Sequence, residues 1–171
     1  MIGKSSIDAV MAVIFQSPTT EFHLRQLEKV TGLSMPTIIS ATDKLARMGL
    51  ITKEKGKIMT LVKANAENRD FIRYKRLYNI RALYESGIVD WLDKAYNHPQ
   101  AIVLFGSFSR GEDIEKSDID LAVKTTRKQR PDTAKYEKML GKRVSIHEVD
   151  ERISEEFKAS LHNGIVLEGS W

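Results

Sequence analysis

Four residues in the C-terminal half have the types and spacing that phosphate and metal chemistry requires. Gly106 and Ser107 follow an apolar run over 101–105, and Asp118 and Asp120 stand two positions apart. A glycine-serine pair between a strand and a helix lets donors approach a phosphate. Carboxylates two apart on a strand point to one face and can hold Mg²⁺. The pattern predicts a phosphate and metal half-site; the alternative for the two aspartates alone is a solvated strand edge.

An alternation of strands and helices is expected to position these residues. Apolar and alternating runs predict strands, at 101–105, 119–123, 143–149 and 165–167. Helical spacing and turn residues predict the helices between them, at 107–113, 132–140 and 151–162. Ser117 is expected to fix the turn into the strand that carries the two aspartates. Residues 98–171 are thus predicted to be an α/β domain with a mixed sheet.

The segment 104–123 resembles the signature of the DNA polymerase β-type nucleotidyltransferase superfamily, Gly-Ser-x-x-x-Gly followed by Asp-x-Asp. With Arg110 before Gly111 and Ser-Asp-Ile-Asp-Leu over 117–121, it is most similar to the minimal nucleotidyltransferases of bacteria and archaea. The resemblance implies binding of a nucleoside triphosphate (NTP) with Mg²⁺ or Mn²⁺, and transfer of a nucleoside monophosphate. It implies Asp118 and Asp120 as catalytic metal ligands, and phosphate binding by Gly106, Ser107 and Arg110. From its chemistry alone, Arg110 either pairs with a phosphate or braces the loop.

One departure from this family bears on catalysis. The family places a third carboxylate on a later strand, and the best alignment puts Ser145 at that position. His147 would share its face, and Glu148 would point away. Serine cannot act as a general base, whereas His147 can accept a proton or be an ordinary polar strand residue. A register shifted by one residue would bring Glu148 inward instead.

The first third of the chain predicts three helices and a hairpin. The helices are expected at 7–15, 21–30 and 34–49, with Ser5 or Ser6 capping the first and Ser34 the third. Their apolar spacing predicts inward side chains, among them Leu24, Leu27 and Val30 in the second helix and Ile38, Ala41, Leu45 and Met48 in the third. Two β-prone runs flank the charged tip 54–57 and predict the hairpin.

This order resembles the winged helix-turn-helix domain of small transcription factors, on residues 22–38 and 45–51. The resemblance implies DNA binding, with the third helix in the major groove and the hairpin as the wing. The residues expected at the DNA are Ser34, Thr37, Ser40, Lys44, Arg47, Lys53, Lys55 and Lys57. No asparagine or glutamine stands on the third helix, so base readout is expected to be weak. The alternative is a module that docks proteins.

Between the two modules, 66–97 predicts a long connecting helix, interrupted near Gly87. The fold class is therefore α+β with two domains, at 1–65 and 98–171. Aromatic residues on the connecting helix predict either a homodimer interface or packing within the chain; they are Tyr74, Tyr78, Tyr84 and Trp91. Twofold DNA sites favour the dimer.

Composition limits the remaining classes. The net charge is +4, and residues 1–65 hold 9 Lys and Arg against 5 Asp and Glu, which suits an anionic partner such as DNA or simply a solvated basic face. There is no cysteine, which excludes disulfides and cysteine-bound zinc. The absence of long apolar runs predicts a cytoplasmic protein without a membrane segment. Two alternative functions stay open: a non-catalytic transcriptional regulator, and the antitoxin of a toxin-antitoxin pair with a small helical toxin as partner.

Overall fold

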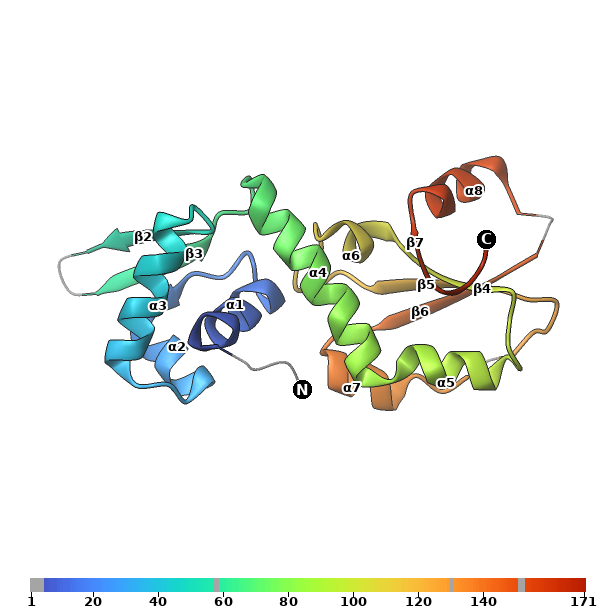
Figure 1. Ribbon diagram of the computed structural model, residues 1–171, viewed down its shortest axis with the longest axis horizontal. Helices are drawn as coiled ribbons and strands as arrows, with labels where there is room; N and C mark the ends of the chain where they lie inside the picture. The colour runs from blue at the N-terminus through green and yellow to red at the C-terminus, as the bar shows by residue number, and fades with distance from the viewer. Residues whose placement is uncertain (1–4, 57–58, 130, 151–152) are drawn as a thin grey trace. The chain divides into compact units, whose positions relative to one another are not determined.

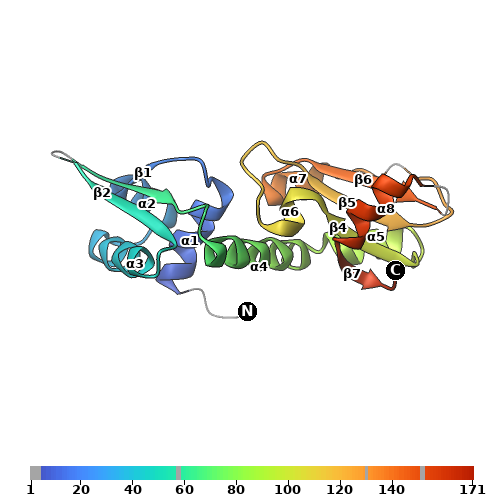
Figure 2. The ribbon, with the colours of Figure 1, turned by 90° about the horizontal axis from the view of Figure 1, so that it is seen from above.

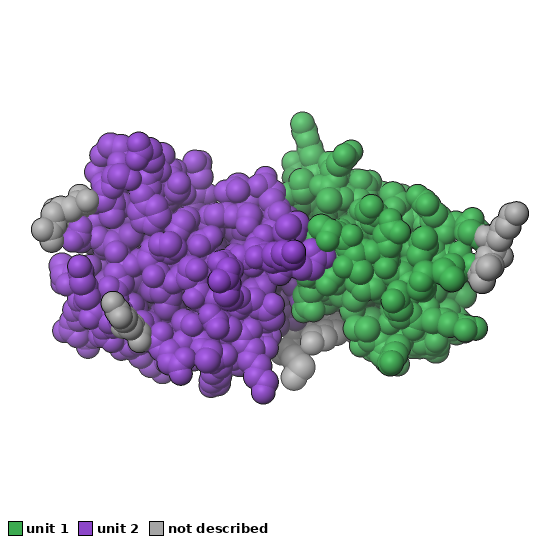
Figure 3. Space-filling model, turned by 180° about the vertical axis from the view of Figure 1, so that it is seen from behind, with its two compact units in different colours: residues 1–75 green, residues 76–171 purple. Residues whose placement is uncertain are grey.

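The computed structural model describes residues 5–56, 59–129, 131–150 and 153–171 (Figure 1). The chain forms two compact units, residues 1–75 and 76–171 (Figure 3). Helix α4 (Arg69–Ser86) contributes to both units. No helix within the described ranges is long and apolar enough to cross a bilayer. The domain boundaries proposed from the sequence, after residues 65 and 97, stay a prediction.

The first unit packs three helices against a small antiparallel sheet (Figures 1 and 2). The helices are α1 (Ser6–Gln16), α2 (Leu24–Thr31) and α3 (Met35–Arg47). The strands are β1 (Phe22–His23), β2 (Ile51–Lys55) and β3 (Thr60–Ala64), in the order β1-β3-β2. Ser5 begins α1 in a capping box, since its hydroxyl accepts from the Asp8 backbone N–H and the Asp8 carboxylate accepts from that of Ser5. The predicted helices and hairpin are present in the predicted order.

Three details of the first unit differ from the prediction. The second helix starts at Leu24 rather than at residue 21, because Phe22 and His23 pair with β3. Val30, predicted to point inward, is 64% exposed in the last turn of the short helix α2; Leu27 is buried as predicted and Leu24 is half-buried. Met48 is 47% exposed, because it follows the last helical residue as the C-cap and leaves the inward stripe. Ile38, Ala41 and Leu45 are buried as predicted.

The second unit carries a four-stranded mixed sheet with helices on both faces (Figures 1 and 2). Its elements after α4 are α5 (Ile88–Ala95), β4 (Ala101–Phe105), α6 (Gly106–Arg110), β5 (Ile119–Lys124), α7 (Ala134–Leu140), β6 (Val144–Val149), α8 (Glu155–His162) and β7 (Ile165–Gly169). The sheet order is β6-β5-β4-β7; β5 and β6 are parallel, and the other pairs are antiparallel. The mixed sheet and its strands agree with the prediction. Gly87, at φ 76°, separates α4 from α5 as expected.

Each face of this sheet buries its own apolar cluster. On one face, Leu104, Leu121 and Val123 pack with residues of α5 and with Tyr136 of α7. On the other face, Ala101, Val103, Phe105, Ala122 and Val149 pack with Leu161 and Phe157 of α8. Because β4 is covered on both sides, all five of its residues are apolar and buried. The side chains of Asp120 and Ser145 belong to the α8 face, because they alternate with residues of the first cluster.

Two of the aromatic residues predicted on the connecting helix contact their own unit. The Tyr84 hydroxyl donates to the Leu167 carbonyl at 2.8 Å. The Trp91 ring lies 4.7 Å from the Tyr136 ring, centre to centre. Packing within the chain therefore accounts for Trp91, whereas Tyr84 is hydrogen-bonded within its unit but remains 48% exposed. Tyr74 is 47% exposed.

Candidate functional site

The turn from β4 into α6 brings the backbone of Gly106 against a carboxylate of β5. Gly106 has φ 75°, a conformation that side-chain-bearing residues rarely adopt. A Cβ at this position would lie 2.6 Å from Oδ2 of Asp120, well inside van der Waals contact. The Ser109 hydroxyl donates to the Gly106 carbonyl at 2.8 Å and holds the turn. The backbone conformation thus favours glycine here, and a Cβ would in addition displace the end of the Asp120 side chain.

Strand pairing gathers the site at one end of the sheet. Asp120 pairs with Phe105 of β4 on one side and with Ser145 of β6 on the other. Ala122 pairs with His147, so Ser145 and His147 share the face of Asp120. This confirms the predicted face of β6, with Ser145 opposite Asp120.

Glu148 points to the other face and is already bound there. Its Oε1 accepts a hydrogen bond from the Tyr96 hydroxyl at 2.8 Å and another from the backbone N–H of Gln129. Burial, and then the carboxylate of Glu148, raise the pKa of the Tyr96 phenol well above its ordinary value. The alternative register, with Glu148 facing the aspartates, is therefore wrong.

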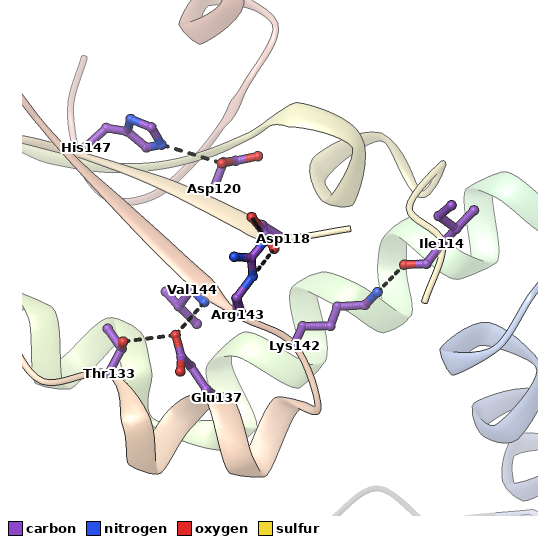
Figure 4. Close-up of polar contacts among 9 residues, drawn as sticks. All are labelled: Ile114, Asp118, Asp120, Thr133, Glu137, Lys142, Arg143, Val144 and His147. Carbon is purple, nitrogen blue, oxygen red and sulfur yellow. Dashed lines mark hydrogen bonds and ion pairs between the residues drawn. The ribbon is translucent and has the colours of Figure 1, made fainter. Parts of the chain in front are cut away.

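The two aspartates have different neighbours, as Figure 4 shows. Arg143 binds both carboxylate oxygens of Asp118, with Nε to Oδ1 at 3.0 Å and a terminal nitrogen to Oδ2 at 3.1 Å. Asp120 instead faces His147, whose Nε2 lies 3.5 Å from Oδ1. Asp118 is thus held by a cation of this chain, whereas Asp120 has an imidazole at a distance longer than a hydrogen bond.

The loop between α6 and β5 is shaped by its own side chains. Arg110 pairs with Glu112, Nε to Oε2 at 2.7 Å, so in this structure it braces the loop. The Ser117 hydroxyl accepts from the backbone N–H of Ile114 at 2.9 Å and fixes the turn into β5, as predicted. The Ser107 hydroxyl makes no hydrogen bond within the described ranges.

A buried polar network under this loop was not predicted. Asp113 is 2% exposed; its Oδ1 accepts from the Asn79 amide at 2.7 Å, and its Oδ2 lies 3.2 Å from Nζ of Lys142. The Asn79 amide also donates to the Phe108 carbonyl at 2.9 Å. The network joins α4, the loop between α6 and β5, and the segment before β6. It therefore fixes the position of the loop that leads into β5. An aspartate in a polar loop carries no sequence signal of burial, because its partners lie 34 and 29 positions away.

An open hollow of about 680 Å³ adjoins β6. Its lining comes from the loop after β5, from β6 and from the α8 region: Lys128, Gln129, Ile146, His147, Glu148, Val149, Ile153 and Phe157. Of the cations in the loop 124–130, Lys128 lines this hollow. Arg130 lies outside the described residues.

The segment that holds the sheet, the glycine turn and the two aspartates matches the model of a known family. Residues 88–170 match the family model described as polymerase beta, nucleotidyltransferase. This part of the chain is a nucleotidyltransferase-like domain. The match covers every strand of the mixed sheet, and also the glycine turn and both aspartates. Neither the curated proteins nor the solved structures contain a significant match to the chain.

The residues of the nucleotidyltransferase-like domain suit Mg²⁺ only in part. Mg²⁺ commonly takes one or two carboxylates and completes its shell with water and substrate phosphates, which Asp118 and Asp120 satisfy. Within the described ranges, no group of three or more His, Cys, Asp or Glu side chains is arranged to hold a metal. The pair therefore fits an ion that shares its coordination with a nucleotide.

The candidate DNA-contacting residues are located in the first unit. Ser34, Ser40, Lys44, Arg47 and Lys55 are exposed, and Thr37 is half-buried. Ser34 and Thr37 hydrogen-bond to each other through their hydroxyls at 2.9 Å. Lys57 lies outside the described residues.

Lys53 differs from the other candidates. Its side chain is 10% exposed, and its Nζ lies 2.7 Å from the Asp43 carboxylate and 3.1 Å from the Thr42 hydroxyl. The hydrogen bond and charge of Lys53 lower the pKa of Asp43. Lys53 therefore ties the hairpin to α3 and is not presented to solvent like Lys55.

Proposed function

We propose that the protein binds DNA through its first unit and that its nucleotidyltransferase-like domain binds NTP with Mg²⁺ and transfers a nucleoside monophosphate to a protein or nucleic-acid acceptor. The observation that carries the nucleotide part is the contact between Gly106 and Asp120. It keeps one side of a carboxylate clear of any side chain, at the turn to which the family resemblance assigns phosphate binding. The Ser107 hydroxyl, which has no hydrogen bond in the described ranges, is the donor assigned to a phosphate oxygen.

In the proposed reaction, an acceptor hydroxyl oxygen forms a bond to the α-phosphorus. The bond from that phosphorus to the bridging oxygen of pyrophosphate breaks, and pyrophosphate leaves with the electron pair. Bound Mg²⁺ would supply neutralisation of the phosphate charge, and Asp118 and Asp120 would hold it. Because serine is not basic, Ser145 cannot take the acceptor's proton, which passes to solvent. A slow transfer is therefore expected.

The nucleotide part is tested by equilibrium binding of radiolabelled NTPs with Mg²⁺, followed by mass spectrometry of candidate acceptors for an added nucleoside monophosphate. Wild type is expected to bind saturably and only with the metal, and Asp118→Asn/Asp120→Asn to lose binding. Asp90→Asn, an exposed change on α5, is the matched control and should bind as wild type does. Absence of NTP binding by the intact protein would contradict the proposal.

The DNA-binding part is supported by the first unit's architecture and surface. Three helices lead into a hairpin, and α3 presents short side chains near its start with Lys44 and Arg47 further along. Short side chains permit close approach of a helix to the major groove, and the cations suit phosphates. Lys53 anchors the hairpin on α3. Any DNA that contacts α3 would then meet Lys55 in a defined position.

Fluorescence anisotropy with duplex DNA over a range of salt concentrations tests this part. Lys44→Ala and Arg47→Ala are each expected to weaken binding to all sequences and to lower the slope of log K against log salt by about 1. Arg73→Ala removes an exposed cation of the same unit that is paired with Asp70. It is the control and should leave the slope unchanged. Equal slopes in all four proteins would contradict direct phosphate contact by α3.

A second candidate function is favoured by β6. Ser145 stands opposite Asp120, and Arg143 occupies Asp118, an arrangement suited to a regulator whose nucleotidyltransferase-like domain docks a partner or dimerises. In that case the Asp118→Asn/Asp120→Asn protein should keep DNA binding and repression unchanged, with or without nucleotide. A change in DNA affinity upon NTP addition would contradict this second candidate.

A further inference from the structure

His147 presents a ring nitrogen to the site without using it. Its Nε2 is buried from solvent and makes no hydrogen bond within the described ranges. The imidazole lies against Phe105, at 5.2 Å between ring centres in an edge-on arrangement, and against Phe157 at 5.7 Å. These rings hold the imidazole on the Asp120 face. The polar group beside this nitrogen is the Asp120 carboxylate, at an ion-pair distance of 3.5 Å, so the nitrogen keeps its capacity to bind a ligand.

The distance from His147 to Asp120 indicates what that ligand is. Nε2 lies 3.5 Å from Oδ1 of Asp120, beyond the usual range of a hydrogen bond between nitrogen and oxygen. Two ligand atoms that are each ~2.1 Å from one tetrahedral zinc ion lie roughly 3.4 Å apart. The same two atoms on an octahedral Mg²⁺ would lie only about 2.9 Å apart. The observed separation thus matches two donors of one metal ion better than it matches a hydrogen bond.

The chemistry of the pair selects among metals. Mg²⁺ prefers oxygen ligands, whereas imidazole nitrogen suits zinc and other first-row transition ions. We propose that His147 Nε2 and Asp120 Oδ1 together bind a first-row transition ion at the proposed nucleotide site; the spacing favours Zn²⁺, and Mn²⁺ serves as its spectroscopic probe. This inference deepens the proposed nucleotide function, because it replaces the missing third carboxylate with an imidazole from the same strand as Ser145.

The rest of the shell stays open in this arrangement. The described residues supply no third carboxylate or histidine to the pair as the structure stands. Asp118, two positions before Asp120, is paired with Arg143. Water, phosphate oxygens and, once released from Arg143, the Asp118 carboxylate would fill the remaining positions, as a site that receives a substrate requires.

Pulsed electron paramagnetic resonance of Mn²⁺ bound to the full-length protein tests the proposal without reference to activity. Nitrogen modulation from a coordinated imidazole is expected in wild type and absent in His147→Gln. Calorimetric titration with Zn²⁺ should show at least about tenfold weaker binding in His147→Gln, with Mg²⁺ binding little changed. His98→Asn removes another of the four histidines at an exposed position and is the matched control.

A second variant keeps the test decisive if His147→Gln misfolds. His147→Asp exchanges the nitrogen donor for oxygen, so the nitrogen modulation should vanish while Mg²⁺ binding strengthens. Wild-type Mn²⁺ without nitrogen modulation, or Zn²⁺ affinity equal in wild type and both variants, would overturn the inference. NTP binding that persists in that event would leave the proposed function standing. Nitrogen-coordinated Mn²⁺ without NTP binding would support the metal site and contradict the proposed nucleotide function.

Discussion

Replacing Gly106 with alanine is the sharpest test of the proposed nucleotide site. The left-handed backbone at φ 75° costs a residue with a Cβ roughly 1–2 kcal/mol. The new Cβ would also lie 2.6 Å from Oδ2 of Asp120, so that carboxylate must move by roughly an ångström to restore ordinary contact. Overpacking of this kind costs a further ~1–3 kcal/mol. Gly106→Ala is therefore expected to lower the free energy of unfolding by about 2–5 kcal/mol.

Gly87→Ala separates the cost of backbone strain from the cost of the contact with Asp120. Gly87 lies in the same unit at φ 76°, and a Cβ there meets no atom within 4 Å. The control thus carries the backbone strain alone, about 1–2 kcal/mol. Adding Asp120→Ala to Gly106→Ala should remove the close contact and reduce the alanine's cost to the Gly87 value, a coupling that a double-mutant cycle measures.

The assays are urea unfolding for stability and calorimetry with Mg²⁺ and NTP for binding. Displacement of Asp120 by an ångström should weaken Mg²⁺-NTP binding at least about tenfold in Gly106→Ala, since misplacement on this scale costs catalysis up to ~10²-fold. Gly87→Ala should bind normally. If the two alanine variants lost equal stability and both bound Mg²⁺-NTP as wild type does, the reasoning that ties Gly106 to Asp120 would be refuted.

Three further changes probe the same domain. Arg143→Gln frees Asp118 from its ion pair. It should raise Mg²⁺ affinity, measured by calorimetry, roughly twofold to fivefold, since exposed ion pairs contribute up to about 1 kcal/mol. Weaker binding of Mg²⁺-NTP in this variant would instead indicate that Arg143 is a phosphate ligand. Ser145→Asp places a carboxylate opposite Asp120 of β5. Without metal, urea unfolding should show that the free energy of unfolding falls by up to about 1 kcal/mol, and calorimetry should show a gain in Mg²⁺ affinity. An unchanged Mg²⁺ affinity would contradict a metal site at this face. Tyr96→Phe removes a hydrogen bond to Glu148 and should cost about 1 kcal/mol. Because the folded-state pKa of Tyr96 is raised, its stabilisation is complete below about pH 10 and is lost as the pH rises from there, so wild type should lose stability above pH 10 more steeply than Tyr96→Phe.

The sequence predicted what local signals encode. The capping serine of α1, the interruption at Gly87 and the unbroken apolar run of β4 each act through neighbouring residues, and each prediction is confirmed. The family alignment predicted that Ser145 faces the aspartates, and alternation along β6 then predicted His147 on the same face and Glu148 on the other; the strand pairing agrees. Period-two alternation fixes faces wherever one face is buried, so this part of the site was accessible.

Partners distant in the chain escaped prediction. The two-residue strand β1 exists only because β3 lies beside it, about forty positions later. Lys53 was expected at the hairpin surface, but Asp43 of α3 holds it. The buried carboxylate of Asp113 depends on Asn79 and Lys142, and the residues next to Asp113 in the sequence give no sign of either partner. Such contacts arise from tertiary packing, which overrides local preference.

The position of β6 at the edge of the described sheet affects which residues of the domain can be substituted during evolution. Asp120 lies on β5 between two strands, and Gly106 is confined by it, so replacements at either position disturb the core of the sheet. Ser145 and His147 lie on β6, which borders only β5 among the described strands. A lineage can therefore exchange serine, histidine or aspartate at these positions without rebuilding the fold. On the proposed function, the choice of metal and the rate of transfer would thus be able to change separately from the binding of phosphate.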